Sequence, residues 1–148
     1  MYKRQVTDGA CGIAVKSKDQ TVILATAPVA SIVKGAAYKP SQFEITLEGC
    51  SVDTYTTASF DFSGQSTDGG AALANTAPQN AASGVGIQLI DMDSKAIKIG
   101  VAGQGAKMNL AAGAANTARF TAGLYGLSTG PVTSGTVSAT ANFNIVYE

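Results

Sequence analysis

The sequence predicts an all-β fold, an antiparallel sandwich or barrel, in a single domain over residues 1–148. Three observations lead to this prediction. Several short segments alternate between apolar and polar residues, which is the two-residue period of a strand with one buried face. No segment keeps the longer apolar period that a helix requires. Glycines, prolines and short polar runs separate the alternating segments, as turns separate strands.

The clearest alternation lies at the end of the chain, over Gly135–Glu148. Apolar or aromatic residues stand at every second position from Val137 to Tyr147, and polar residues fill the positions between them as far as Asn144. Chain termini fray unless the fold holds them, so we expect this terminal strand to lie within a sheet. Its core-facing residues are expected to be Val137, Ala139, Ala141, Phe143, Ile145 and Tyr147.

Seven earlier segments are expected to be extended, because each is short, largely apolar and bounded by turn residues. In chain order they are Cys11–Val15, Thr21–Ala25, Gln42–Glu48, Ala58–Ser63, Gly84–Asp91, Ala96–Ile99 and Ala118–Tyr125. The polar run Lys16–Gln20 is expected to be a turn, and Ala30–Gly35 a short helical turn. Residues 64–83 and 100–116 are mainly small and carry no period, so we expect two surface loops there.

Composition and charge exclude several classes of function. Ten basic residues balance ten acidic ones, so the chain lacks the positive charge typical of nucleic-acid binding. Its longest apolar runs are too short to cross a bilayer, and we expect no membrane insertion. There is no histidine, and no nucleophile stands beside an evident base, so we expect no enzyme and no cofactor. The carboxylates of Asp91 and Asp93 are expected to be solvated turn residues rather than metal ligands.

The two cysteines, Cys11 and Cys50, belong to no CxxC motif and have no histidine to complete a zinc site. They are either two buried free thiols or one disulfide, and we favour the disulfide. A disulfide indicates an oxidising compartment. Closing a loop of this length would stabilise the fold by roughly 4 kcal/mol on the chain-entropy account.

The opening residues carry no signal peptide, because Met1–Gln5 contains no apolar stretch and the patterned sequence begins near Val6. We interpret the chain as a mature form, a trimmed form or a gene fragment. Residues 1–5 are candidates for non-native residues.

Six motifs occur in order around the cysteine pair. They are Cys11-Gly-Ile13, Phe43-Glu-Ile-Thr-Leu-Glu-Gly-Cys50, Phe60-Asp-Phe-Ser-Gly64, Gly84-Val-Gly-Ile-Gln-Leu-Ile-Asp91, Arg119-Phe-Thr-Ala122 and the alternating end with its penultimate Tyr147. Each motif alone is weak. Their order and spacing together resemble the structural subunits of chaperone–usher fimbriae, the pilins of type 1 and P pili of Gram-negative bacteria. The resemblance runs from Val6 to Glu148.

The resemblance implies an incomplete immunoglobulin-like β-sandwich that lacks one strand and carries a disulfide between Cys11 and Cys50. A groove open to the core would run beside the terminal strand, and an apolar groove at an unpaired edge invites aggregation. Another chain would complete the sheet by adding a strand. This mode is β-augmentation, of which donor-strand complementation in pilins is a standard instance.

The partners that the resemblance implies are a periplasmic pilus chaperone, which donates the first strand, an outer-membrane usher, and neighbouring subunits, whose N-terminal extensions replace the chaperone's strand. Such head-to-tail contacts do not close and therefore produce a filament. The implied location is an extracellular fimbrium reached through the periplasm. This sequence departs from the family at its start, because only Met1–Thr7 precede Asp8–Cys11. Either the donor extension has been lost from this chain, which we favour, or the chain is the domain of a larger tip protein. In both cases we expect it to accept a strand but not to donate one.

The implied binding surface for the chaperone and for neighbouring subunits is Val137, Ala139, Ala141, Phe143, Ile145, Tyr147 and Glu148, the last through its α-carboxylate. The expected groove floor, chosen by apolar alternation, is Ile13, Val15, Leu47, Ile87, Leu89 and Leu124. One alternative is a tip adhesin or adaptor domain that binds a host receptor through residues 64–83, although that loop has almost no aromatic side chains to stack on sugars. Another is a free-standing immunoglobulin-like adhesive domain, which would be a complete sandwich without a groove.

Overall fold

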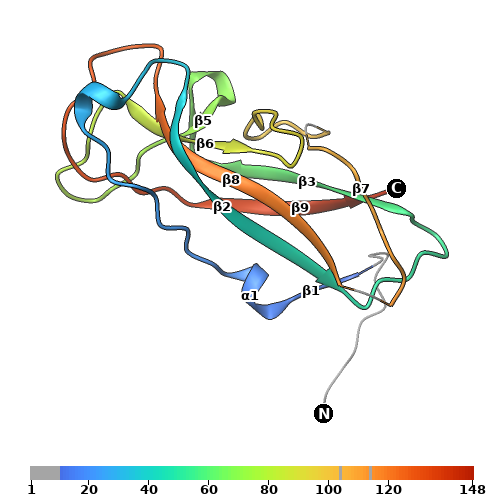
Figure 1. Cartoon of the computed structure of the whole chain (residues 1–148). Helices are drawn as coiled ribbons and strands as arrows, with labels where there is room; N and C mark the ends of the chain where they lie inside the picture. Colours follow the sequence, from blue (N-terminus) through green and yellow to red (C-terminus); the bar gives the residue numbers. More distant parts are fainter. Residues whose placement is uncertain (1–10, 104, 114) are drawn as a thin grey trace.

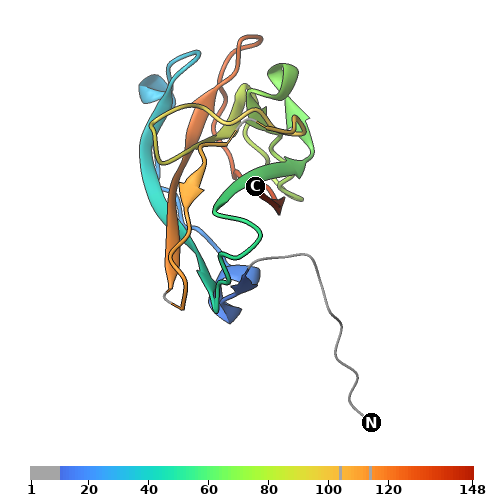
Figure 2. The same ribbon diagram turned by 90° about the vertical axis from the view of Figure 1, so that its right-hand side faces the viewer.

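Two antiparallel sheets face each other in the computed structural model, which describes residues 11–103, 105–113 and 115–148 (Figure 1). Sheet A has the strand order β1-β2-β8-β6-β5-β4, and sheet B has the order β7-β3-β9. The strands are β1 (Gly12–Ile13), β2 (Ala37–Glu48), β3 (Thr57–Gly64), β4 (Ser66–Thr67), β5 (Ala72–Leu73), β6 (Val85–Ile90), β7 (Met108–Asn109), β8 (Asn116–Gly126) and β9 (Ala141–Tyr147). Figure 2 shows β2 and β8 on one side of the molecule and β3 on the other. The predicted all-β sandwich is confirmed.

The helical pieces in the described residues are short: α1 (Val15–Lys18), η1 (Val29–Ser31) and η2 (Asp68–Gly70). The first overlaps the expected polar turn Lys16–Gln20 but begins one residue earlier, and η1 overlaps the expected helical turn Ala30–Gly35. None of these helices is long and apolar enough to cross a membrane.

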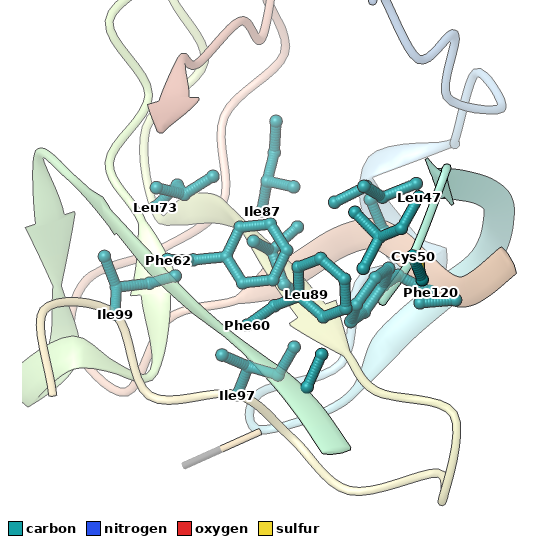
Figure 3. Close-up of a cluster of buried hydrophobic side chains, with 14 residues drawn as sticks. Leu47, Cys50, Phe60, Phe62, Leu73, Ile87, Leu89, Ile97, Ile99 and Phe120 are labelled. Atoms are coloured by element: carbon teal, nitrogen blue, oxygen red, sulfur yellow. The ribbon is translucent and has the colours of Figure 1, made fainter. Parts of the chain in front are cut away.

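The core lies between the sheets and is centred on three phenylalanines (Figure 3). Phe60 and Phe62 of β3 meet Phe120 of β8, with ring centroids 5.4 Å and 5.2 Å apart and the ring planes nearly perpendicular. Edge-to-face pairs of this kind contribute about 0.5–1.5 kcal/mol beyond the burial of their area. None of the three rings is more than 4% exposed, so these contacts join the two sheets at their centre.

β2 and β8 form the long central pair of sheet A. On its inner side Ile45 lies opposite Ala118, and both are fully buried. On its outer side the Glu44 carboxylate accepts a hydrogen bond from Arg119 Nε at 2.9 Å, and both side chains are exposed. Inner and outer positions alternate as the sequence pattern indicated, so the predicted strands Gln42–Glu48 and Ala118–Tyr125 are confirmed.

The predicted strand Cys11–Val15 is wrong in its second half. β1 ends at Ile13, and Val15 begins α1 with 82% of its surface exposed. Val15 therefore does not face the core. The physical reason is a hydrogen bond from β2 to the side chain of Ser17, which replaces the expected strand pairing.

The two predicted loops, residues 64–83 and 100–116, contain strands. The first loop includes β4, η2 and β5, and the second includes β7. Leu73 of β5 pairs with Ile87 of β6 and is only 3% exposed, so a segment without periodicity extends sheet A. Two-residue strands are too short to produce an alternating pattern.

The predicted strand Ala96–Ile99 is wrong as a strand. Only Ala96 forms an isolated bridge, to Ile90, but Ile97 and Ile99 are buried in the core at 1% and 4% exposure. The apolar pattern correctly predicted that Ile97 and Ile99 are buried, but it wrongly predicted that the segment pairs as a strand.

The terminal strand is shorter than predicted. β9 covers Ala141–Tyr147, whereas Val137 and Ala139 precede it. Both of these residues still pack against the core cluster. Thr136 makes an isolated bridge with Ala81 instead, so the first half of the predicted strand follows another part of the chain.

Candidate strand-acceptor site at the edge of β9

β9 is an edge strand with one unpaired side in the part of the chain that the structure describes. It pairs with β3 along its whole length, from Gly64 opposite Ala141 to Ala58 opposite Tyr147 (Figure 1). No other described strand pairs with it.

The hydrogen-bonding pattern identifies the backbone groups of β9 that β3 does not bind. Thr57 and Glu148 exchange both backbone hydrogen bonds, at 2.9 Å and 3.0 Å. In an antiparallel ladder such pairs recur at every second residue, and the residues between them turn their N–H and C=O groups to the other side. The residues whose backbone groups face the open edge are therefore Ala141, Phe143, Ile145 and Tyr147.

The side chains of these same residues face the core but are incompletely covered. The Phe143 ring lies 6.2 Å from that of Phe60 and 6.3 Å from that of Phe62, and Ile145 packs against the same cluster. Phe143 and Ile145 remain half-buried, whereas Phe60 and Phe62 are 1% and 4% exposed. An added strand would therefore cover apolar side chains and backbone groups together.

The other sheet edges in the described residues are short or blocked. β1, β4 and β7 have two residues each. The edge of β2 that faces away from β8 is interrupted by Pro40, which has no N–H. Further along this edge, the side chains of Ser17 and Gln20 bind the backbone of β2. Proteins protect their edge strands with such features. β9 is the long edge strand without this protection.

A second unpaired segment borders the same core. Residues 19–27 lead from α1 to η1 without forming a strand, and no backbone hydrogen bond joins them to another described residue. Val22 and Leu24 pack against the core cluster, whereas Ile23 between them is 79% exposed. The side chains thus alternate as in a strand, but the backbone has no partner. We name β9 and residues 19–27 together the acceptor edge.

Both ends of the terminal segment are anchored. Before β9, the Asn75 side chain donates to the Thr136 carbonyl at 2.8 Å and accepts from the Ser138 N–H at 3.0 Å. At the other end, the Tyr147 hydroxyl donates to the Cys11 carbonyl at 3.3 Å. Burial raises the pKa of this hydroxyl above the ordinary value of a tyrosine. The open length of β9 lies between these two anchors.

The predicted disulfide between Cys11 and Cys50 is confirmed. It ties the residue before β1 to the turn after β2. The Asn116 side chain donates to Cys50 Sγ at 3.2 Å and to the Ala111 carbonyl at 3.1 Å, inside the fold. Because the Tyr147 hydroxyl donates to the Cys11 carbonyl, the disulfide also fixes the end of β9.

The residues predicted for the groove floor lie at different depths. Leu47, Ile87 and Leu89 are buried in the core cluster, and Ile13 is partly buried against it. Leu124 is half-buried outside that cluster. Val15 projects into solvent, as described above. The structure thus brings Ile13, Leu47, Ile87 and Leu89 to the core that β9 borders.

At the end of the chain, the Glu148 main-chain oxygen accepts hydrogen bonds from the N–H groups of Thr56 and Thr57, both at 2.9 Å. Its side-chain carboxylate pairs with Lys107 at 2.7 Å, and both side chains are more than half exposed. Such an exposed pair contributes little, about 0–1 kcal/mol, to stability.

Sequence reasoning missed the polar residues that shape the site. Asn75 lies in a small-residue loop, and Ser17 and Gln20 lie in a polar run, so no periodicity distinguishes them. Their roles depend on partners far away in the sequence, such as Thr46 for Ser17. Asparagine side chains often bind backbone groups in loops, but the loop 64–83 contains two asparagines, Asn75 and Asn80, and the sequence does not distinguish them.

Within the described residues no group of three or more His, Cys, Asp or Glu side chains is placed to hold a metal ion. Asp91 is buried, and its Oδ1 accepts hydrogen bonds from the N–H groups of Asp93 and Lys95 at 2.9 Å and 3.0 Å. This carboxylate closes a turn. Two hollows of about 390 Å³ and 520 Å³ flank Arg119 on sheet A, and neither is lined by a residue of β9.

Comparison with protein families matches residues 1–148 to the family described as "Fimbrial protein". A type 1 fimbrial subunit of Salmonella typhimurium is 35% identical over 153 residues, which cover 99% of this chain and 80% of the relative. The minor fimbrial subunit HifD of Haemophilus influenzae is 34% identical over 150 residues, which cover 96% of this chain and 69% of the relative.

Solved structures give the same result. The P pilus rod subunit PapA superposes with a TM-score of 0.80 at 25% identity, covering 95% of this chain and 100% of that one. The antigen and type I fimbria protein BPSL1626 of Burkholderia pseudomallei superposes with a TM-score of 0.66 at 31% identity, covering 95% of this chain and 91% of that one.

Proposed function

This chain belongs to the fimbrial protein family as a structural fimbrial subunit, and we propose that it is assembled by accepting a strand at the open edge of β9. One observation carries the proposal. Unpaired backbone groups and half-buried apolar side chains coincide on the same residues of β9, among them Phe143 and Ile145. An added strand would satisfy both.

The accepted strand must itself alternate. Backbone hydrogen bonds can be made by almost any sequence, so specificity comes from side chains at every second position. The core beside β9 is lined by Phe143 and Ile145 on one border and by Val22 and Leu24 on the other. A donor therefore needs apolar residues toward the core and polar residues toward solvent.

Donors of two kinds fit this proposal. A periplasmic chaperone would supply the strand first and keep the acceptor edge from aggregating, and a neighbouring subunit would then replace it at the outer-membrane usher. The contact is head-to-tail and does not close, so repetition gives a filament on the cell surface. Catalysis has no part in this function.

The predicted loss of a donor extension concerns residues 1–10, which lie outside the described residues. It stays a prediction that this chain accepts a strand without donating one. The tip-adhesin alternative is not favoured, because the relatives that match nearly the whole chain are fimbrial subunits.

Co-expression with a cognate periplasmic pilus chaperone tests the proposal. We expect a complex of one chaperone and one subunit, measured by size-exclusion chromatography, and no complex after removal of Asn144–Glu148. Arg119→Ala, on the outer side of sheet A, is the matched control and should leave the yield of complex unchanged. A soluble monomer that is stable alone and forms no complex would contradict strand acceptance.

A further inference from the structure

The first segment leaves sheet A abruptly after β1, although its register could continue. β1 places Ile13 opposite Leu47 in antiparallel pairing. One more step in this register brings Ala14 opposite Thr46, where two residues of a regular ladder would exchange both backbone hydrogen bonds. The structure shows that only half of this exchange is made.

The side chain of Ser17 makes the hydrogen bond that the Ala14 carbonyl would make in a regular ladder. The Ala14 N–H donates to the Thr46 carbonyl at 2.9 Å, as a ladder requires, but the Thr46 N–H donates to Ser17 Oγ at 2.8 Å. The Ala14 carbonyl is thereby released and accepts the Ser17 N–H at 2.9 Å, which closes the single turn of α1. Ser17 is 6% exposed, so its hydroxyl replaces a backbone carbonyl inside the fold. Short polar side chains compete with secondary structure in this way.

At the next pairing position along β2, the Gln20 side chain likewise takes the place of a backbone group. The same register would place Lys16 opposite Glu44, with the Lys16 N–H donating to the Glu44 carbonyl. Instead, that carbonyl accepts from Gln20 Nε2 at 2.9 Å. Side chains therefore occupy two successive pairing positions on the edge of β2 that faces away from β8. We name Ser17 and Gln20 the ladder stop.

The chain beyond the ladder stop follows a different course. A helical turn advances about 1.5 Å per residue against about 3.3 Å for a strand, so α1 does not keep pace with β2. Residues 19–27 then run without backbone pairing, and they place Val22 and Leu24 on the core cluster. Continued pairing would carry these residues along β2 toward Pro40.

We propose that Ser17 and Gln20 are positioning residues that end the β1–β2 pairing and so keep residues 19–27 on the core as the second border of the acceptor edge. The inference rests on the proposed strand acceptance at β9 and adds the residues that hold its other border. Both residues act through the segment that they place.

NMR spectroscopy of the chain alone tests this inference, with the double variant Ser17→Ala/Gln20→Ala. We expect the Lys16 amide to exchange with solvent about tenfold more slowly, because it gains the Glu44 carbonyl as a ladder partner. We also expect the nuclear Overhauser contacts between the Val22 and Leu24 methyl groups and the core to be lost. The matched control is Lys18→Ala, which removes an exposed side chain from α1 and should change neither result.

A merely structural role predicts a different outcome. The double variant would then lose protection at Thr46 while Val22 and Leu24 keep their core contacts, and this result would overturn the inference. If the double variant does not fold, Ser17→Ala alone gives the same test, since alanine has no oxygen to accept from the Thr46 N–H. These measurements use the chain without a chaperone or a second subunit. The inference about the ladder stop and the proposal of strand acceptance can therefore be refuted independently.

Discussion

Replacing Ala141 by proline tests which side of β9 receives a strand. Ala141 lies opposite Gly64, next to the hydrogen-bonded pair of Asn142 and Ser63, so its N–H points away from β3. Asn142 lies opposite Ser63 in a hydrogen-bonded pair, so its N–H belongs to the ladder. Ala141→Pro and Asn142→Pro therefore introduce the same ring at neighbouring positions on opposite sides of the strand.

The two substitutions should differ in their cost to the chain alone. Ala141→Pro removes no internal hydrogen bond, and proline is tolerated where the N–H side of an edge strand faces solvent, so we expect a loss of under about 1 kcal/mol. Asn142→Pro removes a ladder bond and leaves the Ser63 carbonyl without its donor, which costs about 2–4 kcal/mol in unfolding free energy.

Binding of an added strand should be weakened more by Ala141→Pro than by Asn142→Pro, the reverse of their order in stability. At Ala141 the proline ring occupies the side where an added strand would approach to about 4.8 Å, and one backbone donor is missing. We expect complex formation with the chaperone to weaken at least about tenfold, which corresponds to about 1.4 kcal/mol. Urea unfolding of each variant, followed by titration with the chaperone, measures the two effects separately.

Equal destabilisation by the two prolines would refute the assignment of backbone groups to the two sides of β9. Unchanged chaperone binding by Ala141→Pro, in a chain of normal stability, would refute the open edge as the acceptor.

Three further predictions concern the fold itself. Replacing Cys11 and Cys50 by alanine should lower the free energy of unfolding by about 4 kcal/mol on the chain-entropy account, measured by urea unfolding against the oxidised chain. Phe120→Ala should cost about 3–5 kcal/mol in the same assay, because the ring is 2% exposed between the sheets; a loss below about 1 kcal/mol would contradict this core. Burial raises the pKa of Tyr147 above its ordinary 10.0, so the tyrosine's contribution to stability is complete below pH 10.0 and is lost as the pH rises through the folded-state pKa. Tyr147→Phe should therefore flatten the alkaline fall in stability, and an unchanged fall would contradict the shift.

The fold class could be predicted from the sequence because a two-residue apolar period indicates a strand with one buried face. Ile45 and Phe120 face the core where the alternation put them. Ile97 and Ile99 show the limit of the same signal, since they are buried without belonging to a strand. Alternation reveals which side chains are covered, but it does not reveal whether the backbone has a partner.

Of the candidate site, the strand β9 was predictable from the sequence, whereas the course of residues 19–27 was not. Phe143, Ile145 and Tyr147 stand in a long alternating run, which indicates a strand with one face toward the core, and only the family resemblance implied an open edge beside it. The course of residues 15–20 depends on Ser17, whose hydroxyl competes with a backbone carbonyl for a donor 29 residues away. Local pattern cannot decide such a competition, and it extended the strand to Val15.

The unequal size of the two sheets leads to the same acceptor as the hydrogen bonds do. Sheet A has six strands and sheet B has three, so sheet B covers less of the shared core. On the β7 side the difference is made up by the segment that carries Ile97 and Ile99, where Gly100 N–H donates to the Phe62 carbonyl at 2.8 Å (Figure 3). On the side of β9 that faces away from β3, no described segment pairs with the strand, and Phe143 stays half-buried. A strand added at β9 would supply the cover that sheet B lacks, whereas one added beyond β7 would meet a core that is already closed.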